Sequence, residues 1–269
     1  DPSASTLFNG EHSLQRYWMG RDSMGDVTAE SVRLFAPAKL TTSLRVVGVR
    51  NDGYHLIDAE MVSLDFGDSL IVDCESAGPV SVSFADVNGK TIDLGVDNLV
   101  TRALAMVGRD ASVHVQKLIA AGAGLGGGSA DAAAILYWAG MTDPAQAVTL
   151  GADVAFCLLG GRARVQGIGE QIEPLPFEER TFTLLTPPVM CSTPAVYKAW
   201  DDLGGPLGVN GNDLEPAALL VAPELARWRD ELAAASGRQP RLAGSGSTWF
   251  VEGAFPGPGR VIAHASPAR

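Results

Sequence analysis

The chain has 269 residues, of which 46% are hydrophobic and 19% charged, so it can bury a core and is not a disordered chain. Its 31 acidic and 20 basic residues give a net charge of −11, which argues against nucleic acid and anionic membranes as partners. An anionic substrate would therefore need backbone N–H groups and a few well-placed cations.

Residues 1–30 are polar and weakly periodic, and we expect them to form a leader or flexible extension. No apolar run in the sequence is long enough for a transmembrane helix, so no membrane partner is expected. The cysteines Cys74, Cys157 and Cys191 are far apart and lack the spacing of zinc ligands. This cysteine usage predicts reduced thiols in a cytoplasmic protein.

From Ser31 onward the sequence predicts strands, because Val, Ile, Thr and Phe alternate with polar residues between Gly and Asp turns. The expected strands cover 32–40, 42–50, 61–74 and 80–87, with a polar turn at 51–55. A helix is expected at 98–108, with Asp97 as its N-cap. A strand at 112–120 then leads into a glycine run and a helix of small residues from about Ser129 to Trp138.

The second half of the chain predicts a mixture of helices and strands. A short helix and a turn holding Asp153 come first, followed by a strand at 181–190, helices at 192–200 and 223–235, and a second glycine turn at 241–253. The order is β-rich first and mixed afterwards, without linker composition between the parts. We therefore expect an α+β fold of two packed lobes, 31–170 and 171–269, with a cleft between them.

The glycine run is the most informative feature of the sequence. Five glycines fall within seven residues: Gly122, Gly124, Gly126, Gly127 and Gly128. They cost conformational entropy, but a backbone without Cβ atoms can approach a ligand closely. The helix that follows offers free N–H groups and a partial positive charge at its start, an arrangement that suits a phosphate chain. The alternative is a purely structural connection between strand and helix.

Two better-known glycine loops fit this run poorly. Gly122, Gly124 and Gly127 match G-x-G-x-x-G, which would indicate a dinucleotide-dependent oxidoreductase. However, the loop lies in mid-chain, and no strand-ending acid stands about 20 residues later. A Walker A loop is excluded because Ser129 follows Gly128 with no lysine before it.

Five motifs of this sequence resemble, in the same order, the motifs of the GHMP kinase superfamily. They are APAKL at 36–40, NDGYHLI at 51–57, AGLGGGSADAA at 123–133, LGADVAF at 150–156 and RLAGSGS at 241–247. The resemblance is strongest to members that phosphorylate a cytidine-diphosphate-linked methylerythritol in the non-mevalonate isoprenoid pathway. It implies a two-lobed GHMP kinase-like fold, in which a β-rich N-terminal lobe with the glycine-loop helix and a mixed α/β C-terminal lobe enclose the active site.

The resemblance also implies roles for individual residues. Lys39 and Asp153 would lie together at the transferred phosphate as the catalytic pair. ATP would be bound by the loop Ala120, Ala121, Gly122, Ala123, Gly124, Leu125, Gly126, Gly127, Gly128, Ser129 and Ala130. Mg²⁺ would be held through the nucleotide, with Ser129 as a ligand.

The remaining implied residues belong to the acceptor and to the phosphates. Tyr54 and His55 would contact the cytidine of the substrate, and Thr41 and Thr193 would lie on the substrate side; a helix N-cap is the alternative role for Thr193. The residues that the resemblance places near the phosphates are Gly244, Ser245, Gly246 and Ser247. Lys117 is added because it stands just before the glycine loop. For Lys117 the alternative is a strand-capping role.

Three positions depart from the family pattern, since Thr41 stands where Asn is usual, and Ala120 and Ala155 stand where Pro is usual. Lys39, Asp153 and the glycine loop are all retained. Two alternatives stay open at this point: a GHMP kinase for mevalonate, homoserine or a sugar, and a nucleotide-binding module without catalysis. The partners are expected to be ATP and a small polyol acceptor, and the enzyme to be a monomer or homodimer.

Overall fold

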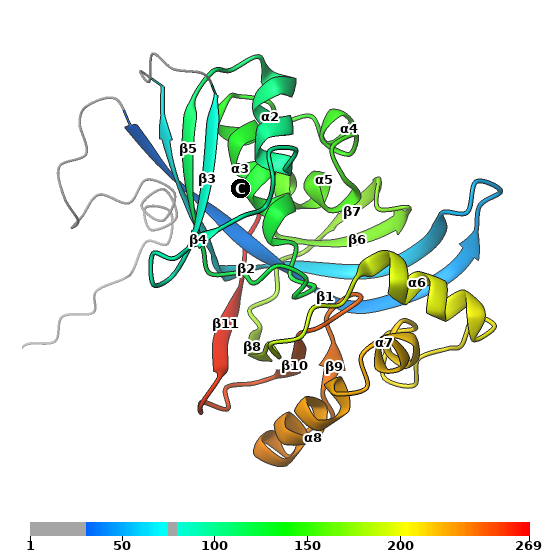
Figure 1. Ribbon diagram of the computed structural model, residues 1–269. Coiled ribbons are helices and arrows are strands. Elements are labelled where there is room, and N and C mark those ends of the chain that lie inside the picture. The colour runs from blue at the N-terminus through cyan, green and yellow to red at the C-terminus, as the bar shows by residue number, and fades with distance from the viewer. Residues whose placement is uncertain (1–30, 75–79) are drawn as a thin grey trace, which may run out of the picture.

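The computed structural model describes residues 31–74 and 80–269, and the leader expected at 1–30 lies outside the described residues. Its strands form an 11-stranded mixed sheet with helices packed on it (Figure 1). The strands are β1 (Ser31–Val49), β2 (His55–Asp73), β3 (Ser81–Asp86), β4 (Thr91–Ile92), β5 (Ser112–Lys117), β6 (Arg162–Gly167), β7 (Gln171–Leu175), β8 (Thr181–Leu185), β9 (Arg241–Leu242), β10 (Trp249–Glu252) and β11 (Arg260–Ser266).

The helices of the described residues fall into two groups. The first group packs beside β5 and β6, and the second lies beside the far end of the β1–β2 hairpin and below it (Figure 1). They are α2 (Leu99–Val107), α3 (Gly127–Trp138), α4 (Pro144–Ala147) and α5 (Ala152–Leu159), then α6 (Thr193–Asp202), α7 (Glu215–Val221) and α8 (Leu225–Ser236). No helix in the described part of the chain is long and apolar enough to cross a membrane.

The first two expected strands are one long strand, β1, with irregular pairing to β2. Its register shifts between Pro37 and Lys39 and again between Thr41 and Ser43. Pro37 lacks a backbone N–H and is tolerated at such a bulge. Gly67 of β2 lies opposite, where a Cβ would come within 2.2 Å of the Ala36 carbonyl oxygen. The bulges therefore interrupt the regular alternation of side chains where β1 carries Lys39 and Thr41.

Strand β2 joins the parts of the sheet. One edge of β2 pairs with β1 along most of its length, and the other edge pairs in turn with β6, β11 and β5. Strand β11 continues to β8, which pairs with β10. The expected lobe boundary at residue 170 stays a prediction; it falls between β6 and β7, which are neighbours in this sheet.

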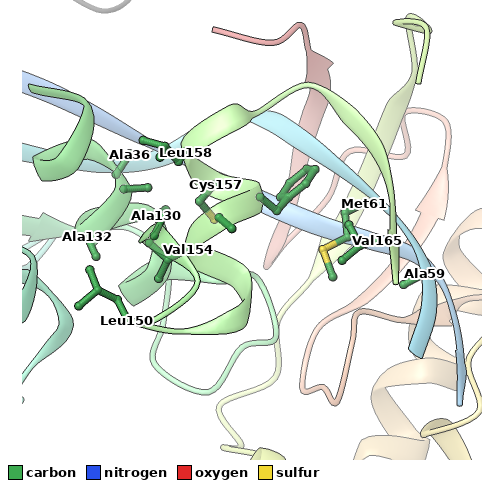
Figure 2. Close-up of a cluster of buried hydrophobic side chains, with 14 of the residues drawn as sticks. Ala36, Ala59, Met61, Ala130, Ala132, Leu150, Val154, Cys157, Leu158 and Val165 are labelled. Atoms are coloured by element: carbon green, nitrogen blue, oxygen red, sulfur yellow. The ribbon is translucent and has the colours of Figure 1, made fainter. Parts of the chain in front are cut away.

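Small residues allow α3 and α5 to pack closely under the sheet. Figure 2 shows Ala130 and Ala132 of α3 near Val154 of α5, within a cluster that also includes Ala36 of β1. Helix α3 begins at Gly127, two residues before the expected start, because the glycines of its first turn adopt helical backbone. Helix α2 is capped by Asn98, whose side chain accepts a hydrogen bond from the Thr101 N–H. The prediction of Asp97 as the N-cap is therefore wrong by one residue.

Candidate active site

Lys39 and Asp153 lie together, although 114 positions separate them in the sequence. Lys39 Nζ is 3.2 Å from Asp153 Oδ2 and donates to Thr41 Oγ1 at 3.1 Å. The Lys39 side chain is 7% exposed and the Asp153 side chain 33%, so the carboxylate is the more open member. The lysine is thus held within the protein, while its partner remains accessible to a substrate.

Asp153 lies in the first turn of α5 and not in the turn that the sequence predicted. The run from Ala152 to Leu159 is helical, and extended Gly151 precedes it as N-cap. A helix has a partial positive charge at its N-terminus, which favours a carboxylate in the first turn. Asp153 is therefore on a regular element with a fixed direction.

The glycine loop passes between Lys39 and the second glycine turn. Leu125 O accepts from the Lys39 N–H at 3.0 Å, so the loop is attached directly to β1. Gly126 has φ +69°, and a Cβ there would lie 2.7 Å from Lys39 Cγ. Gly124 has φ +78°, and its Cβ would lie 2.3 Å from the Ala243 carbonyl oxygen. Packing against the protein thus requires these two glycines, independently of any ligand.

The N-terminal turn of α3 provides the donors for an anion. Its N-cap, Gly126, has no side chain to cap the first N–H groups of the helix. Gly127, Gly128 and Ser129 all line the same cleft as Lys39 and Asp153. These N–H groups and the helix dipole together favour a phosphate.

Lys117 is buried between two carboxylates at the base of this loop. Its Nζ contacts Asp68 and lies 2.6 Å from Asp131 Oδ2. Burial raises the pKa of Asp131 to about 7, with the Lys117 charge opposing and the Asp68 charge adding to this shift. Asp68 also accepts from the Leu118 and Ile119 N–H groups. The positive charge of Lys117 is thus balanced within the protein, and its expected proximity to phosphates stays a prediction.

His55 and α6 form the far wall of the cleft. His55 Nε2 is 2.8 Å from Asp201 Oδ1, and the imidazole centroid is 4.6 Å from that of the Tyr197 ring and 5.5 Å from that of Trp200. Burial, together with the Asp153 charge, raises the pKa of Tyr197 to about 12, so its hydroxyl is protonated at neutral pH. Tyr54, at the hairpin turn, is exposed and lines the cleft beside His55. The wall presents aromatic rings and polar groups together.

Thr193 connects α6 to the second glycine turn. It is the first residue of α6, and the N-cap is Ser192, so Thr193 is not the cap. Its Oγ1 lies 2.9 Å from Ser245 Oγ. This contact brings the start of the helix to the turn that packs on the glycine loop.

The cleft has a volume of about 880 Å³ and gathers most of the residues expected from the sequence. Those that line it are Lys39, Thr41, Tyr54, His55, Lys117, the loop from Ala120 to Ser129, Asp153, Thr193, Gly244 and Ser245. Three expected residues, Ala130, Gly246 and Ser247, are buried and do not line the cleft.

Sequence reasoning missed three residues of α6 and the two carboxylates around Lys117. Tyr197, Lys198 and Asp201 line the cleft. Tyr197 and Trp200 recur at helical spacing, a pattern that also fits core packing, so this signal alone did not distinguish the two roles. Asp131 follows the glycine loop directly, and an acid in a run of alanines was the available sign of a buried partner.

Comparisons with known proteins point to one group of kinases. A 4-diphosphocytidyl-2-C-methyl-D-erythritol kinase of Cereibacter sphaeroides is 39% identical over 244 residues, covering 80% of this chain and 87% of the relative. The enzyme of the same name from Paracoccus denitrificans is 38% identical over 234 residues, covering 80% of this chain and 84% of that relative. No protein-family model matches the chain.

Solved structures agree with these relatives. A crystal structure of 4-(cytidine 5′-diphospho)-2C-methyl-D-erythritol kinase has a TM-score of 0.62 and 31% identity, covering 81% of this chain and 89% of its own. The crystal structure of homoserine kinase from Cytophaga hutchinsonii has a TM-score of 0.54 at 16% identity, covering 92% of this chain and 98% of its own. The second likeness concerns the fold alone.

Proposed function

This chain belongs to the 4-diphosphocytidyl-2-C-methyl-D-erythritol kinases of the GHMP superfamily, and from this we propose how its residues phosphorylate that acceptor. The enzyme is an ATP-dependent phosphotransferase of isoprenoid biosynthesis with an alcohol acceptor. The expected two-lobed GHMP fold is confirmed by the likeness to the solved kinases. The oxidoreductase alternative, which rested on G-x-G-x-x-G alone, is not supported by any of these relatives.

The Lys39–Asp153 pair carries the proposed chemistry. An alcohol is a weak nucleophile, and a carboxylate within hydrogen-bond reach orients it and accepts its proton. In our proposal the acceptor oxygen forms a bond to the γ-phosphorus of ATP, the bond from that phosphorus to the β–γ bridging oxygen breaks, and the proton passes to Asp153. Lys39 offsets the negative charge of the transferring phosphoryl group. The 3.2 Å separation of the pair and the 33% exposure of the Asp153 side chain support this assignment.

The glycine loop is proposed to bind the ATP phosphates. Its N–H groups and the start of α3 face the cleft that Asp153 also lines. Mg²⁺ prefers oxygen ligands, and water and phosphate usually supply several of them. The Ser129 hydroxyl and the Asp153 carboxylate, which both line this cleft, therefore suit the ion. Ser129 is proposed to hold it together with the nucleotide, and the ion would neutralise charge between the phosphates.

The wall formed by Tyr54, His55 and Tyr197 is proposed to bind the cytidine end of the acceptor. Aromatic rings stack on a pyrimidine, and the imidazole can hydrogen-bond its edge. Thr41 and Thr193 would contact the acceptor nearer the reacting hydroxyl. We also propose a cytoplasmic location, because the exposed thiol of Cys74 is suited to a reducing compartment.

The test is ADP release from ATP and Mg²⁺ with 4-diphosphocytidyl-2-C-methylerythritol, run beside mevalonate, homoserine and galactose. Turnover with the cytidine compound alone is expected. His55→Ala should then raise the KM of that acceptor by about 10-fold, the equivalent of one lost hydrogen bond or stacking contact. Turnover with a small acceptor, with a KM unaffected by His55→Ala, would contradict the cytidine site. Absence of turnover with all four would favour a non-catalytic nucleotide-binding module.

A further inference from the structure

The segment from Gly208 to Leu214, between α6 and α7, connects two parts of the active site. It runs beside β1, where the Leu44 N–H donates to Gly211 O at 2.8 Å and the Asp213 N–H donates to Leu44 O at 3.0 Å. The fully buried Asp213 carboxylate accepts from the Val46 N–H at 3.0 Å. The segment is therefore fixed to the same strand that carries Lys39.

Asn212 turns its side chain the other way, toward the second glycine turn. Its Nδ2 donates to Leu242 O at 2.8 Å and to Gly244 O at 2.7 Å. Its Oδ1 accepts from the Leu214 N–H at 2.9 Å. The residue is 3% exposed, and both amide hydrogens and the amide oxygen of its side chain have partners. An amide buried with this geometry holds the two carbonyl groups at a fixed distance from the segment.

The turn that Asn212 holds lies against the reacting groups. A Cβ on Gly244 would lie 3.7 Å from Lys39 Nζ and 3.8 Å from Thr41 Oγ1. Further along the same turn, the Ser247 and Thr248 N–H groups donate to Gly122 O and Ala123 O of the glycine loop, each at 3.1 Å. A shift of this turn would therefore move both the surroundings of Lys39 and the phosphate-binding loop.

We propose that Asn212 is a positioning residue for phosphoryl transfer, which fixes the second glycine turn against Lys39 and the glycine loop. The proposal rests on the kinase function proposed above. Asn212 does not line the cleft, so it acts through the turn and not on a substrate.

The experiment compares Asn212→Ala with Asn210→Ala in the full chain. Asn210 belongs to the same segment and donates its amide to Pro240 O, a carbonyl outside the glycine turn, so it is the matched control. For Asn212→Ala, kcat should fall about 10- to 100-fold, as for small misplacements of reacting groups, with the acceptor KM within about 2-fold of wild type. Asn210→Ala should keep kcat within about 2-fold.

Hydrogen exchange of the Ser247 and Thr248 amides gives a readout that does not depend on the reaction. Their protection should fall about 5-fold or more in Asn212→Ala and remain unchanged in Asn210→Ala. If Asn212→Ala does not fold, Asn212→Ser is used instead, because it retains one shorter donor. It should show a smaller fall in kcat and a smaller loss of amide protection.

Equal kcat and equal exchange in the Asn212 and Asn210 variants would overturn the proposal. Should the wild-type enzyme turn over none of the acceptors, the proposed function fails, whereas the exchange experiment still decides whether Asn212 holds the turn.

Discussion

Two polar neighbours of Asp153, the Cys157 thiol and the Tyr197 hydroxyl, are poor proton acceptors. Cys157, one helical turn further along α5, is buried, and burial raises the pKa of its thiol to about 12, an effect that the Asp153 charge increases. The pKa of Tyr197 is raised to about 12 for the same two reasons. Both groups therefore keep their protons at neutral pH. Of these three, Asp153 is the one suited to accept a proton from an acceptor alcohol.

Asp153→Asn tests this assignment at the level of one residue. The substitution keeps the size of the side chain but removes the charge and most of the basicity, so kcat should fall about 10²- to 10⁴-fold. The affinity for ATP, measured by calorimetry, should stay within a few-fold of wild type because the loop donors are retained. Asp110→Asn, on the exposed loop before β5, is the control for a lost carboxylate. Near wild-type turnover in Asp153→Asn would rule out the proposed role.

Among the elements, the glycine loop and the second glycine turn depend on each other. Gly124 lies against two carbonyl groups of the second glycine turn. A Cβ on Gly124 would be 2.3 Å from the Ala243 carbonyl oxygen and 2.7 Å from that of Gly246. Such an approach is impossible for any residue with a side chain. The glycines of the motif thus serve the packing of two backbones as well as the approach of a ligand.

Three glycine-to-alanine substitutions separate the energetic cost of a left-handed backbone from the cost of a steric clash. Gly140→Ala places a Cβ at φ +82° with nothing within 4 Å, so it measures the backbone cost alone, about 1–2 kcal/mol. Gly124→Ala has a similar φ of +78° and adds the clash, which should cost about 1–3 kcal/mol more. Gly128→Ala, inside α3 with its nearest contact at 3.7 Å, should stabilise the protein by about 1 kcal/mol.

Thermal unfolding of the three variants checks this order. Equal losses in Gly124→Ala and Gly140→Ala would show that the loop can move away from the turn and that the close approach is not required.

The sequence predicted those elements whose residues carry a local signal. The β1–β2 turn, the glycine loop before α3 and helices α6 and α8 all follow from turn residues and helical spacing. Asp153 was placed in a turn because Leu150–Gly151–Ala152 contains a glycine, whereas the helix begins directly after it. The bond from Asp201 to His55 and the bonds of Asn212 are long-range contacts, and no local pattern specifies them.

At the scale of the whole molecule, a charged network connects β2 with the part of the sheet formed by β8, β9 and β10. Glu60 accepts from Arg162 at 3.1 Å and from Arg180 at 2.8 Å. Arg180 also contacts Glu252, which lies 2.9 Å from Arg241. Burial tends to raise the pKa of Glu60, but the hydrogen bond and charge of Arg162, together with the charge of Arg180, outweigh it and hold that pKa below its usual value.

Glu60→Gln should therefore destabilise the protein in a pH-dependent way. A carboxyl with a lowered pKa contributes stability above its unfolded pKa, about 4.5, and loses it as pH falls through the folded value. The difference in unfolding free energy from wild type should be roughly 1 kcal/mol at pH 7, because partial exposure screens these charges.

Urea unfolding between pH 3 and 7 measures this effect, and the difference should shrink toward pH 3. Glu231→Gln, on the exposed face of α8, serves as control and should show no such trend. A difference that stays constant with pH would mean that the Glu60 charge does not contribute through this network.

The position of β2 also bears on how the chain is made. Ser63 of β2 pairs with Ser266 of β11, close to the opposite end of the described sequence. During synthesis, the N-terminal hairpin leaves the ribosome long before β11. The stretch of the β2 edge at Ser63 and Leu64 therefore remains unpaired while about 200 further residues are added, whereas the stretches on either side of it can pair earlier with β5 and β6. The exposed edge of the nascent chain is a site for wrong strand pairing, and chaperones that shield it would favour the correct fold.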